Sequence, residues 1–176
     1  AIKEAHFRGM ELHAWFNPYR ASTGNVLNYS PNHATNIHPE WFFVYGGKYQ
    51  FDPGIPEVRE YIVQVILDVV KGYDIDGVHF DDYFYPYDSY NGGADFPDNL
   101  SWNAYLKSGG KLARADWRRE SVNTFIERVY KEIKAEKKYV KFGISPFGIW
   151  RPGYPESIEG MDQYDKLYAD AKLWLN

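Results

Sequence analysis

The chain has 176 residues, of which 44% are hydrophobic, so it can build a packed core and is not a disordered segment. Its net charge is -4 and no long basic run occurs, which argues against a nucleic-acid-binding face. It has no cysteine, which excludes disulfides and thiolate metal sites, and no apolar run of about 18 residues that would indicate a transmembrane segment.

The first predicted elements are a strand, a long loop and a helix. Residues 9–17 (GMELHAWFN) are predicted to form a buried strand that ends at Pro18. Residues 18–55 form a loop rich in Asn, Pro and aromatic residues, and loops of this length are usually functional. Apolar residues at helical spacing predict a helix over residues 56–73, with Pro56 in its first turn. Its expected buried stripe consists of Val58, Ile62, Val65, Ile66 and Val69.

Two further strand–helix pairs follow along the chain. They are predicted as a strand over residues 75–84, a loop over 85–115 with a short helical turn near 102–106, a helix over 116–137, a strand over 139–145 and a final helix from about residue 162. The second helix presents one apolar face, which consists of Val122, Phe125, Ile126, Val129 and Ile133.

Strands that alternate with helices indicate an α/β fold with a parallel sheet. Long loops follow the strands and short returns precede them, as in a (β/α)8 TIM barrel, whose active site is built by the loops after the strands. A doubly wound sheet shares the alternation, but no Gly-rich phosphate turn follows any strand. The chain does not begin with Met, so we expect a piece of a longer protein. Three strands cannot close a barrel, and residues 1–176 are therefore predicted to be a partial TIM-barrel domain whose open edges favour self-association.

The candidate catalytic residues are Asp81 and Asp82, which end the second predicted strand. Asp is a poor strand former, so the pair either caps a loop or serves chemistry. Glycosidases need two carboxyl groups, one as acid and one as nucleophile or base. Alternation along the strand places His79 and Asp81 on one face. We therefore favour Asp81 as the nucleophile-type carboxylate and Asp82 as an orienting or substrate-binding group. His79 is either the partner of Asp81 or a histidine of the core.

Polar, aromatic and cationic side chains also gather at the ends of the first and third strands. Aromatic residues make up 19% of the chain, which fits either a bulky core or a cleft for sugar rings. The shared pattern at three strand ends favours the cleft. No His or carboxylate stands at a recognised metal-ligand spacing, so we expect neither a metal nor another cofactor. The predicted substrate-binding residues are His13, Trp15, Asn17, Tyr19, Arg20, His79, Tyr83, Tyr85, Ser145, Trp150 and Arg151.

Five segments resemble, in order, the glycosyl hydrolase-like 10 family. They are residues 13–20 (HAWFNPYR), 38–41 (HPEW), 52–59 (DPGIPEVR), 76–86 (DGVHFDDYFYP) and 144–151 (ISPFGIWR). The resemblance covers nearly the whole chain and implies a TIM barrel, of which this chain would hold about strands three to five. It also implies a bacterial glycoside hydrolase that is exported, periplasmic or lipid-anchored to the cell envelope. The implied substrate is a cell-wall polysaccharide such as peptidoglycan glycan without its stem peptides.

Residues 76–81 also look like the fourth-strand motif of alpha-amylase-type barrels, in which the last Asp is the nucleophile. In that family an Arg stands where this chain has His79, and the acid is a Glu where this chain has Ser145. These departures argue against a simple amylase-type assignment. The general acid is expected outside this chain, with Glu156 and Glu159 as weaker candidates within it, so the chain alone is expected to be inactive. The alternative function is a non-catalytic carbohydrate-binding barrel of the cell envelope.

Overall fold

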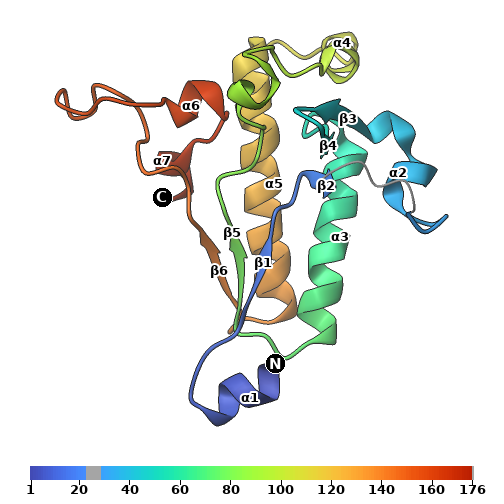
Figure 1. Ribbon diagram of the computed structural model, residues 1–176, viewed down its shortest axis with the longest axis vertical. Helices are drawn as coiled ribbons and strands as arrows, with labels where there is room; N and C mark the ends of the chain where they lie inside the picture. The colour runs from blue at the N-terminus through green and yellow to red at the C-terminus, as the bar shows by residue number, and fades with distance from the viewer. Residues whose placement is uncertain (23–28, 176) are drawn as a thin grey trace.

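The computed structural model describes residues 1–22 and 29–175 (Figure 1). Its elements are α1 (Ile2–Phe7), β1 (His13–Phe16), β2 (Arg20–Ser22), α2 (Ala34–Ile37), a 3-10 turn (Pro39–Trp41), β3 (Phe42–Tyr45), β4 (Lys48–Phe51), α3 (Pro56–Gly72), β5 (Gly77–Phe80), a second 3-10 turn (Asp88–Asn91), α4 (Asn99–Lys107), α5 (Arg114–Glu136), β6 (Lys141–Ile144), α6 (Gln163–Lys166) and α7 (Ala171–Trp174). No helix in this part of the chain is long and apolar enough to cross a membrane.

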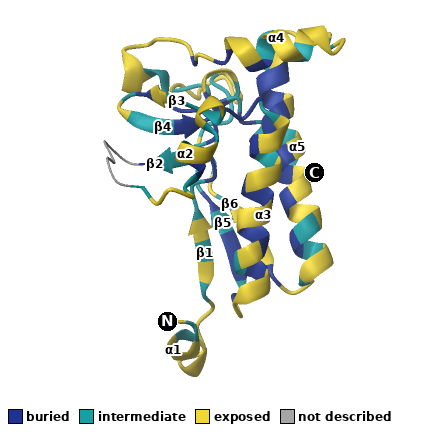
Figure 2. Ribbon diagram, turned by 90° about the vertical axis from the view of Figure 1, so that its right-hand side faces the viewer, coloured by how far each residue is buried: buried dark blue, intermediate teal, exposed yellow. Residues whose placement is uncertain are grey.

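The central sheet has three parallel strands in the order β1-β5-β6. Its register sets His13 beside Gly77 and Gly77 beside Lys141. The long helices α3 and α5 both lie on one side of this sheet (Figures 1 and 2). A doubly wound sheet would carry helices on both sides, whereas the wall of a (β/α)8 barrel carries them only outside. The chain is therefore an α/β segment of a TIM-type barrel, as predicted.

The core lies between the sheet and its two helices. Val78 and Phe80 of β5 are fully buried, and the ring of Phe80 stacks on Phe125 of α5 with centroids 6.0 Å apart. The apolar face predicted for α5 is confirmed, since all five of its residues are buried. Figure 2 shows that the buried residues gather on β5 and on the inner sides of α3 and α5, while β1 is more exposed.

The stripe predicted for α3 is wrong at two of its five positions. Val65 is 39% exposed and Val69 is only partly buried. Val63, Leu67 and Val70 are buried instead. The sequence Val-Ile-Leu-Asp-Val-Val is apolar on nearly every side, so its periodicity does not define the rotation of the helix. Packing against both the sheet and α5 defines it.

A second, antiparallel sheet in the order β2-β4-β3 occupies the segment predicted as the first long loop. The hairpin between β3 and β4 turns at Gly46 and Gly47, whose φ angles of 57° and 72° favour glycine. A Cβ atom on Gly46 would lie 2.8 Å from the Cβ of Tyr90. The hairpin therefore packs tightly on the loop that follows β5.

Several predicted boundaries also change. The three parallel strands are shorter than predicted, and α5 begins at Arg114, earlier than the predicted start at residue 116. The final helix is replaced by two short ones, α6 and α7, because Tyr168 between them adopts a left-handed conformation with φ 54°. β1 and β6 form the two edges of the parallel sheet in the described part of the chain, and self-association through them stays a prediction.

Candidate active site at the carboxyl end of the sheet

Asp81 directly follows β5 at the carboxyl end of the parallel sheet, where it is half-buried. Its carboxylate accepts long hydrogen bonds from Asn17 Nδ2 at 3.3 and 3.4 Å. Its Oδ1 also accepts the backbone N–H of Tyr83 at 3.3 Å. Asn17 directly follows β1, the parallel neighbour of β5, so the register of the two strands brings the amide to the carboxylate. The structure thus joins two of the residues that the sequence selected.

Trp15 and His79 share the face of the sheet that has no helix. The two rings meet edge to face with centroids 6.1 Å apart, and Trp15 is 71% exposed. His13, on the same face, hydrogen-bonds Glu11 at 3.1 Å. His79 contacts Trp15, while the hydrogen bonds of Asp81 come from Asn17 and Tyr83. The predicted partnership between His79 and Asp81 is therefore not formed in this structure, where His79 packs on Trp15 and Asp81 is bonded by Asn17 and Tyr83.

Three tyrosines pack together in the loop after β5, and one of them contacts Asp82. Tyr87 donates a hydrogen bond to Asp82 Oδ2. The ring of Tyr87 lies 5.7 Å from that of Tyr83 and 5.4 Å from that of Tyr90, measured between centroids. The hydrogen bond to Tyr90 raises the pKa of the Tyr83 phenol to about 12, and burial together with Asp82 raises the pKa of Tyr87. Both phenols stay protonated at neutral pH. The O–H of Tyr87 is used by Asp82, whereas the pair Tyr83 and Tyr90 shares one hydrogen bond and so keeps one O–H for a ligand.

Tyr83 is among the site residues predicted from the sequence, whereas Tyr87 and Tyr90 are not. The only signal was their spacing, because the three tyrosines stand at i, i+4 and i+7. The intervening segment includes a 3-10 turn over Asp88–Asn91, which folds Tyr90 back beside Tyr83. That turn was not predicted.

The residues that follow β6 form a separate group. Exposed Ser145 continues the strand, with its N–H donating to the carbonyl of Phe80 at 2.9 Å. Arg151 forms ion pairs with Asp162 and Asp165 at 3.5 and 3.4 Å, in the segment around α6. The ring of Trp150 meets that of Tyr164 at 6.2 Å. Trp150 and Arg151 are thus held by α6 and its flanks, and not by the residues around Asp81.

Two predicted substrate-binding residues lie in the core. Tyr19 is 0% exposed and packs on Phe125, while Tyr85 is 1% exposed and packs on Phe96. Neither ring offers a surface to a sugar in this structure, so this part of the prediction is corrected. Tyr19 and Tyr85 each follow a strand end, but the backbone turns their side chains toward the core and away from the face of the sheet that has no helix.

Residues 1–176 match the family described as Glycosyl hydrolase-like 10. The chain belongs to this family. It is 46% identical over 181 residues to "Glycosyl hydrolase YngK" of Bacillus subtilis, covering 99% of this chain and 35% of that protein. It is 39% identical over 189 residues to "Glycosyl hydrolase DigH" of Escherichia coli, covering 99% of this chain and 42% of that protein. The chain therefore spans well under half the length of these relatives.

Two solved structures share part of the arrangement of this Glycosyl hydrolase-like 10 chain. An alpha-galactosidase from Lactobacillus brevis matches with a TM-score of 0.48 and 14% identity, over 81% of this chain and 17% of that one. The galactosidase domain of the alpha-galactosidase-sucrose kinase AgaSK matches with a TM-score of 0.46 and 21% identity, over 82% and 17%.

The strand ends of this Glycosyl hydrolase-like 10 chain supply different chemical groups. β1 leads to the amide of Asn17, β5 to the carboxylates of Asp81 and Asp82, and β6 to the hydroxyl of Ser145. Within residues 1–22 and 29–175, no group of three or more His, Asp or Glu side chains could hold a metal ion. The three strand ends at the carboxyl edge of the parallel sheet can supply a carboxylate as nucleophile or base, together with the hydrogen-bonding groups of Asn17 and Ser145.

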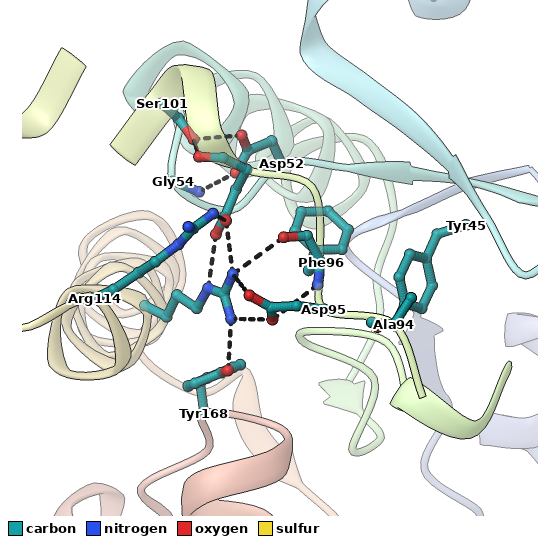
Figure 3. Close-up of polar contacts among 11 residues, drawn as sticks. Tyr45, Asp52, Gly54, Ala94, Asp95, Phe96, Ser101, Arg114 and Tyr168 are labelled. Atoms are coloured by element: carbon teal, nitrogen blue, oxygen red, sulfur yellow. Dashed lines mark hydrogen bonds and ion pairs between the residues drawn. The ribbon is translucent and has the colours of Figure 1, made fainter. Parts of the chain in front are cut away.

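Buried charges support the loops above this edge (Figure 3). Arg118 of α5 is 2% exposed and makes a bidentate contact with Asp98 at 2.7 and 2.8 Å. It also reaches Asp95 at 2.7 Å and the hydroxyl of Tyr168. Asp98 is 0% exposed and accepts a further hydrogen bond from Arg114. One guanidinium thus joins the loop after β5, helix α5 and the segment between α6 and α7.

Asp52 forms a second buried contact at the turn before α3. Its Oδ1 accepts the N–H of Gly54 at 2.8 Å, and its Oδ2 accepts the hydroxyl of Ser101 at 2.6 Å (Figure 3). Burial raises the pKa of this carboxyl to about 6, against the opposing effect of the two hydrogen bonds. The folded protein therefore binds a proton at Asp52 between about pH 4 and pH 6, where the unfolded chain has lost it.

We expect Asp52→Asn to stabilise the protein above pH 6 and to have little effect at pH 4. Because the pKa of Asp52 is raised on folding, its ionisation lowers the free energy of unfolding as the pH rises from about 4 to 6, and the loss is fully present above the folded-state pKa. An amide keeps the acceptor for Gly54 and can donate to Ser101, whose hydroxyl can then bond the carbonyl of Asp98, 3.0 Å away. The expected gain at pH 7.5 is about 2 kcal/mol. Urea unfolding of both proteins from pH 4 to 8 measures it.

The control is Asp68→Asn, on the exposed side of α3. Its effect on the free energy of unfolding is expected to stay within about 0.5 kcal/mol at every pH. A difference between Asp52→Asn and the parent protein that does not change with pH would rule out the titration of Asp52 as its cause.

Proposed function

We propose that the chain supplies part of the active site of a glycoside hydrolase that cleaves a bacterial cell-wall polysaccharide, such as peptidoglycan glycan without stem peptides. The observation that carries the proposal is Asp81, a carboxylate at the carboxyl end of β5 that Asn17 holds beside the helix-free face. Exposed Trp15 on that face offers an apolar surface to a sugar ring. Membership of the Glycosyl hydrolase-like 10 family supports glycosidic chemistry.

In the proposed reaction, Asp81 attacks or stabilises the anomeric carbon while a second carboxyl group protonates the leaving oxygen. The neighbouring strands end in Asn17 and Ser145, so the proposed acid comes from a strand outside these three. A separation between the two carboxyl groups of about 5–5.5 Å would give retention of configuration, and about 6.5–9.5 Å inversion. The proposed substrate lies outside the cytoplasmic membrane, and the proposal therefore includes export to the cell envelope.

The second candidate function is sugar binding without cleavage. One observation favours it, because among the three described strand ends only that of β5 supplies carboxylates. If no strand outside these three supplied a carboxylate, the aromatic and amide groups would still bind a glycan. Both functions therefore predict that the protein binds the glycan, and only the hydrolase function predicts shortened products.

The test is incubation of the full-length protein with purified stem-free glycan, followed by mass spectrometry of the soluble fragments. The hydrolase proposal predicts shortened strands whose amount rises with time and with protein concentration. Glycan that binds and stays intact would favour the second function. Neither binding nor products would exclude both.

A further inference from the structure

Two cations of the antiparallel sheet lie over tyrosine rings of the loop after β5. The guanidinium carbon of Arg20 in β2 is 5.7 Å from the ring centre of Tyr83, and Nζ of Lys48 in β4 is 4.8 Å from that of Tyr90. The hydroxyls of the two tyrosines are 3.4 Å apart. The contacts thus run from one cation through two phenols to the other.

The sheet geometry directs both cations toward this loop. Arg20 is paired with Gln50, and Lys48 stands two residues before Gln50 in β4, so all three emerge on one face. On the same face Tyr45, the partner of Lys48, hydrogen-bonds the carbonyl of Ala94. That bond fixes this face of the sheet against the loop after β5.

Neither cation forms an ion pair with a described residue, although the chain has an excess of acidic groups. The carboxylate of Asp81 is hydrogen-bonded by Asn17, and Asp82 by Tyr87. Arg20 and Lys48 are both half-buried, and charged groups in such positions are normally paired with an opposite charge. Several other arginines in the described part of the chain do pair with carboxylates, namely Arg8, Arg114, Arg118, Arg119, Arg128 and Arg151.

We propose that Arg20 and Lys48, seated on Tyr83 and Tyr90, bind a carboxylate group carried by the polysaccharide. This inference rests on the proposed function and names the chemical feature by which that site selects its substrate. In stem-free peptidoglycan glycan, the lactyl group of each muramic acid residue ends in a free carboxylate. A stem peptide converts that carboxylate into a neutral amide and adds bulk.

The arrangement suits a carboxylate for two reasons. A guanidinium offers paired N–H donors that match both oxygens of a carboxylate, and the hydroxyl pair of Tyr83 and Tyr90, which shares one hydrogen bond, keeps one O–H as a further donor. Tyr83 also donates its backbone N–H to Asp81, so a carboxylate held here would fix the sugar chain beside the proposed nucleophile. The site would thus distinguish a glycan that has lost its stem peptides from one that retains them.

The experiment compares stem-free glycan with the same glycan after its carboxyl groups have been converted to primary amides, a change that removes charge and adds no bulk. Values of kcat and KM are measured for the full-length protein and for Arg20→Gln, Lys48→Gln and Arg20→Lys. For the parent protein we expect KM to be roughly 10- to 100-fold higher on the amidated glycan, as charged hydrogen bonds contribute. In Arg20→Gln and Lys48→Gln this ratio should fall toward one, and Arg20→Lys should retain part of it.

Each variant serves as its own folding control, because only the ratio between the two glycans is compared. Lys107→Gln, an equal loss of charge on exposed α4, should keep the ratio of the parent protein. Equal KM values for the parent protein on both glycans would overturn the inference and leave the hydrolase proposal intact. If neither glycan were cleaved, the hydrolase proposal would fail. Dissociation constants for the same two glycans, measured by calorimetry, would then decide the inference, and equal values would overturn it.

Discussion

Asp81→Asn is expected to lower kcat on stem-free glycan by about 10³-fold, with KM changed by less than about fivefold. An amide has the shape of the carboxylate but neither its charge nor its nucleophilicity. It can still accept the N–H of Tyr83, so the loop after β5 should keep its conformation. The proposed site therefore loses chemistry and retains binding. Steady-state kinetics of the full-length protein, with released reducing ends as the readout, measures both parameters.

Asp82→Asn and Asp68→Asn provide the matched comparison for Asp81. Asp82 is hydrogen-bonded by Tyr87 and is proposed to orient the substrate, so its amide variant should affect KM more than kcat. Asp68 lies on the exposed side of α3 and its variant should have no effect on either parameter. Unchanged kcat in Asp81→Asn would remove Asp81 from the proposed chemistry. An equal loss in all three variants would point to a general effect of charge.

Arg118→Met is expected to destabilise the protein by about 3–5 kcal/mol. The substitution fills a similar volume but leaves the carboxylate of Asp98 buried with only Arg114 to pair with it. It also frees Asp95 and Tyr168, which hold the loops above the sheet. Urea unfolding followed by circular dichroism measures the loss. A smaller change than 1 kcal/mol would contradict the role assigned to this guanidinium.

Two further variants separate charge burial from lost packing. Arg118→Met combined with Asp98→Asn removes both members of the buried pair and should recover part of the loss, because no fully buried charge remains; Arg114 also loses Asp98, but its side chain is 29% exposed and reaches solvent. Arg128→Met removes the exposed ion pair of Arg128 with Glu60, whose side chains are 43% and 47% exposed, and should cost less than about 1 kcal/mol. If the double variant were less stable than Arg118→Met, packing around Arg118 would account for the effect.

The sequence predicted those features that depend on local periodicity and on chain order. The apolar face of α5 repeats at helical spacing, and all five of its predicted residues are buried. The order of strands and helices predicted parallel pairing, which then placed Asn17 beside Asp81. Both results follow from patterns within one element or from the geometry shared by all parallel sheets.

Features that depend on contacts between distant segments were not predicted. The antiparallel sheet within residues 18–55 has short strands without regular alternation, and its β3-β4 hairpin is fixed partly by the contact of Gly46 with Tyr90. The burial of Tyr19 and Tyr85 depends on which way the backbone turns after each strand. No pattern in the sequence indicated that Arg118 would lie in the interior, because Arg is normally exposed and its partners Asp95 and Asp98 precede it by 23 and 20 residues.

The parallel register also has a consequence for how fast the chain folds. Between β1 and β5, Leu12 is hydrogen-bonded to Asp76 and Asn17 to Asp81, each across 64 residues of chain. Between β5 and β6, Gly77 pairs with Lys141 across the same number of residues. Closing a loop of equal length costs equal chain entropy, so neither pairing is favoured by proximity along the chain. We therefore expect the helices in the chain segments between the paired strands, α3 before β5 and α5 before β6, to decide which strand pairing forms first. Such long separations give a high contact order, and folding in milliseconds or more slowly is expected.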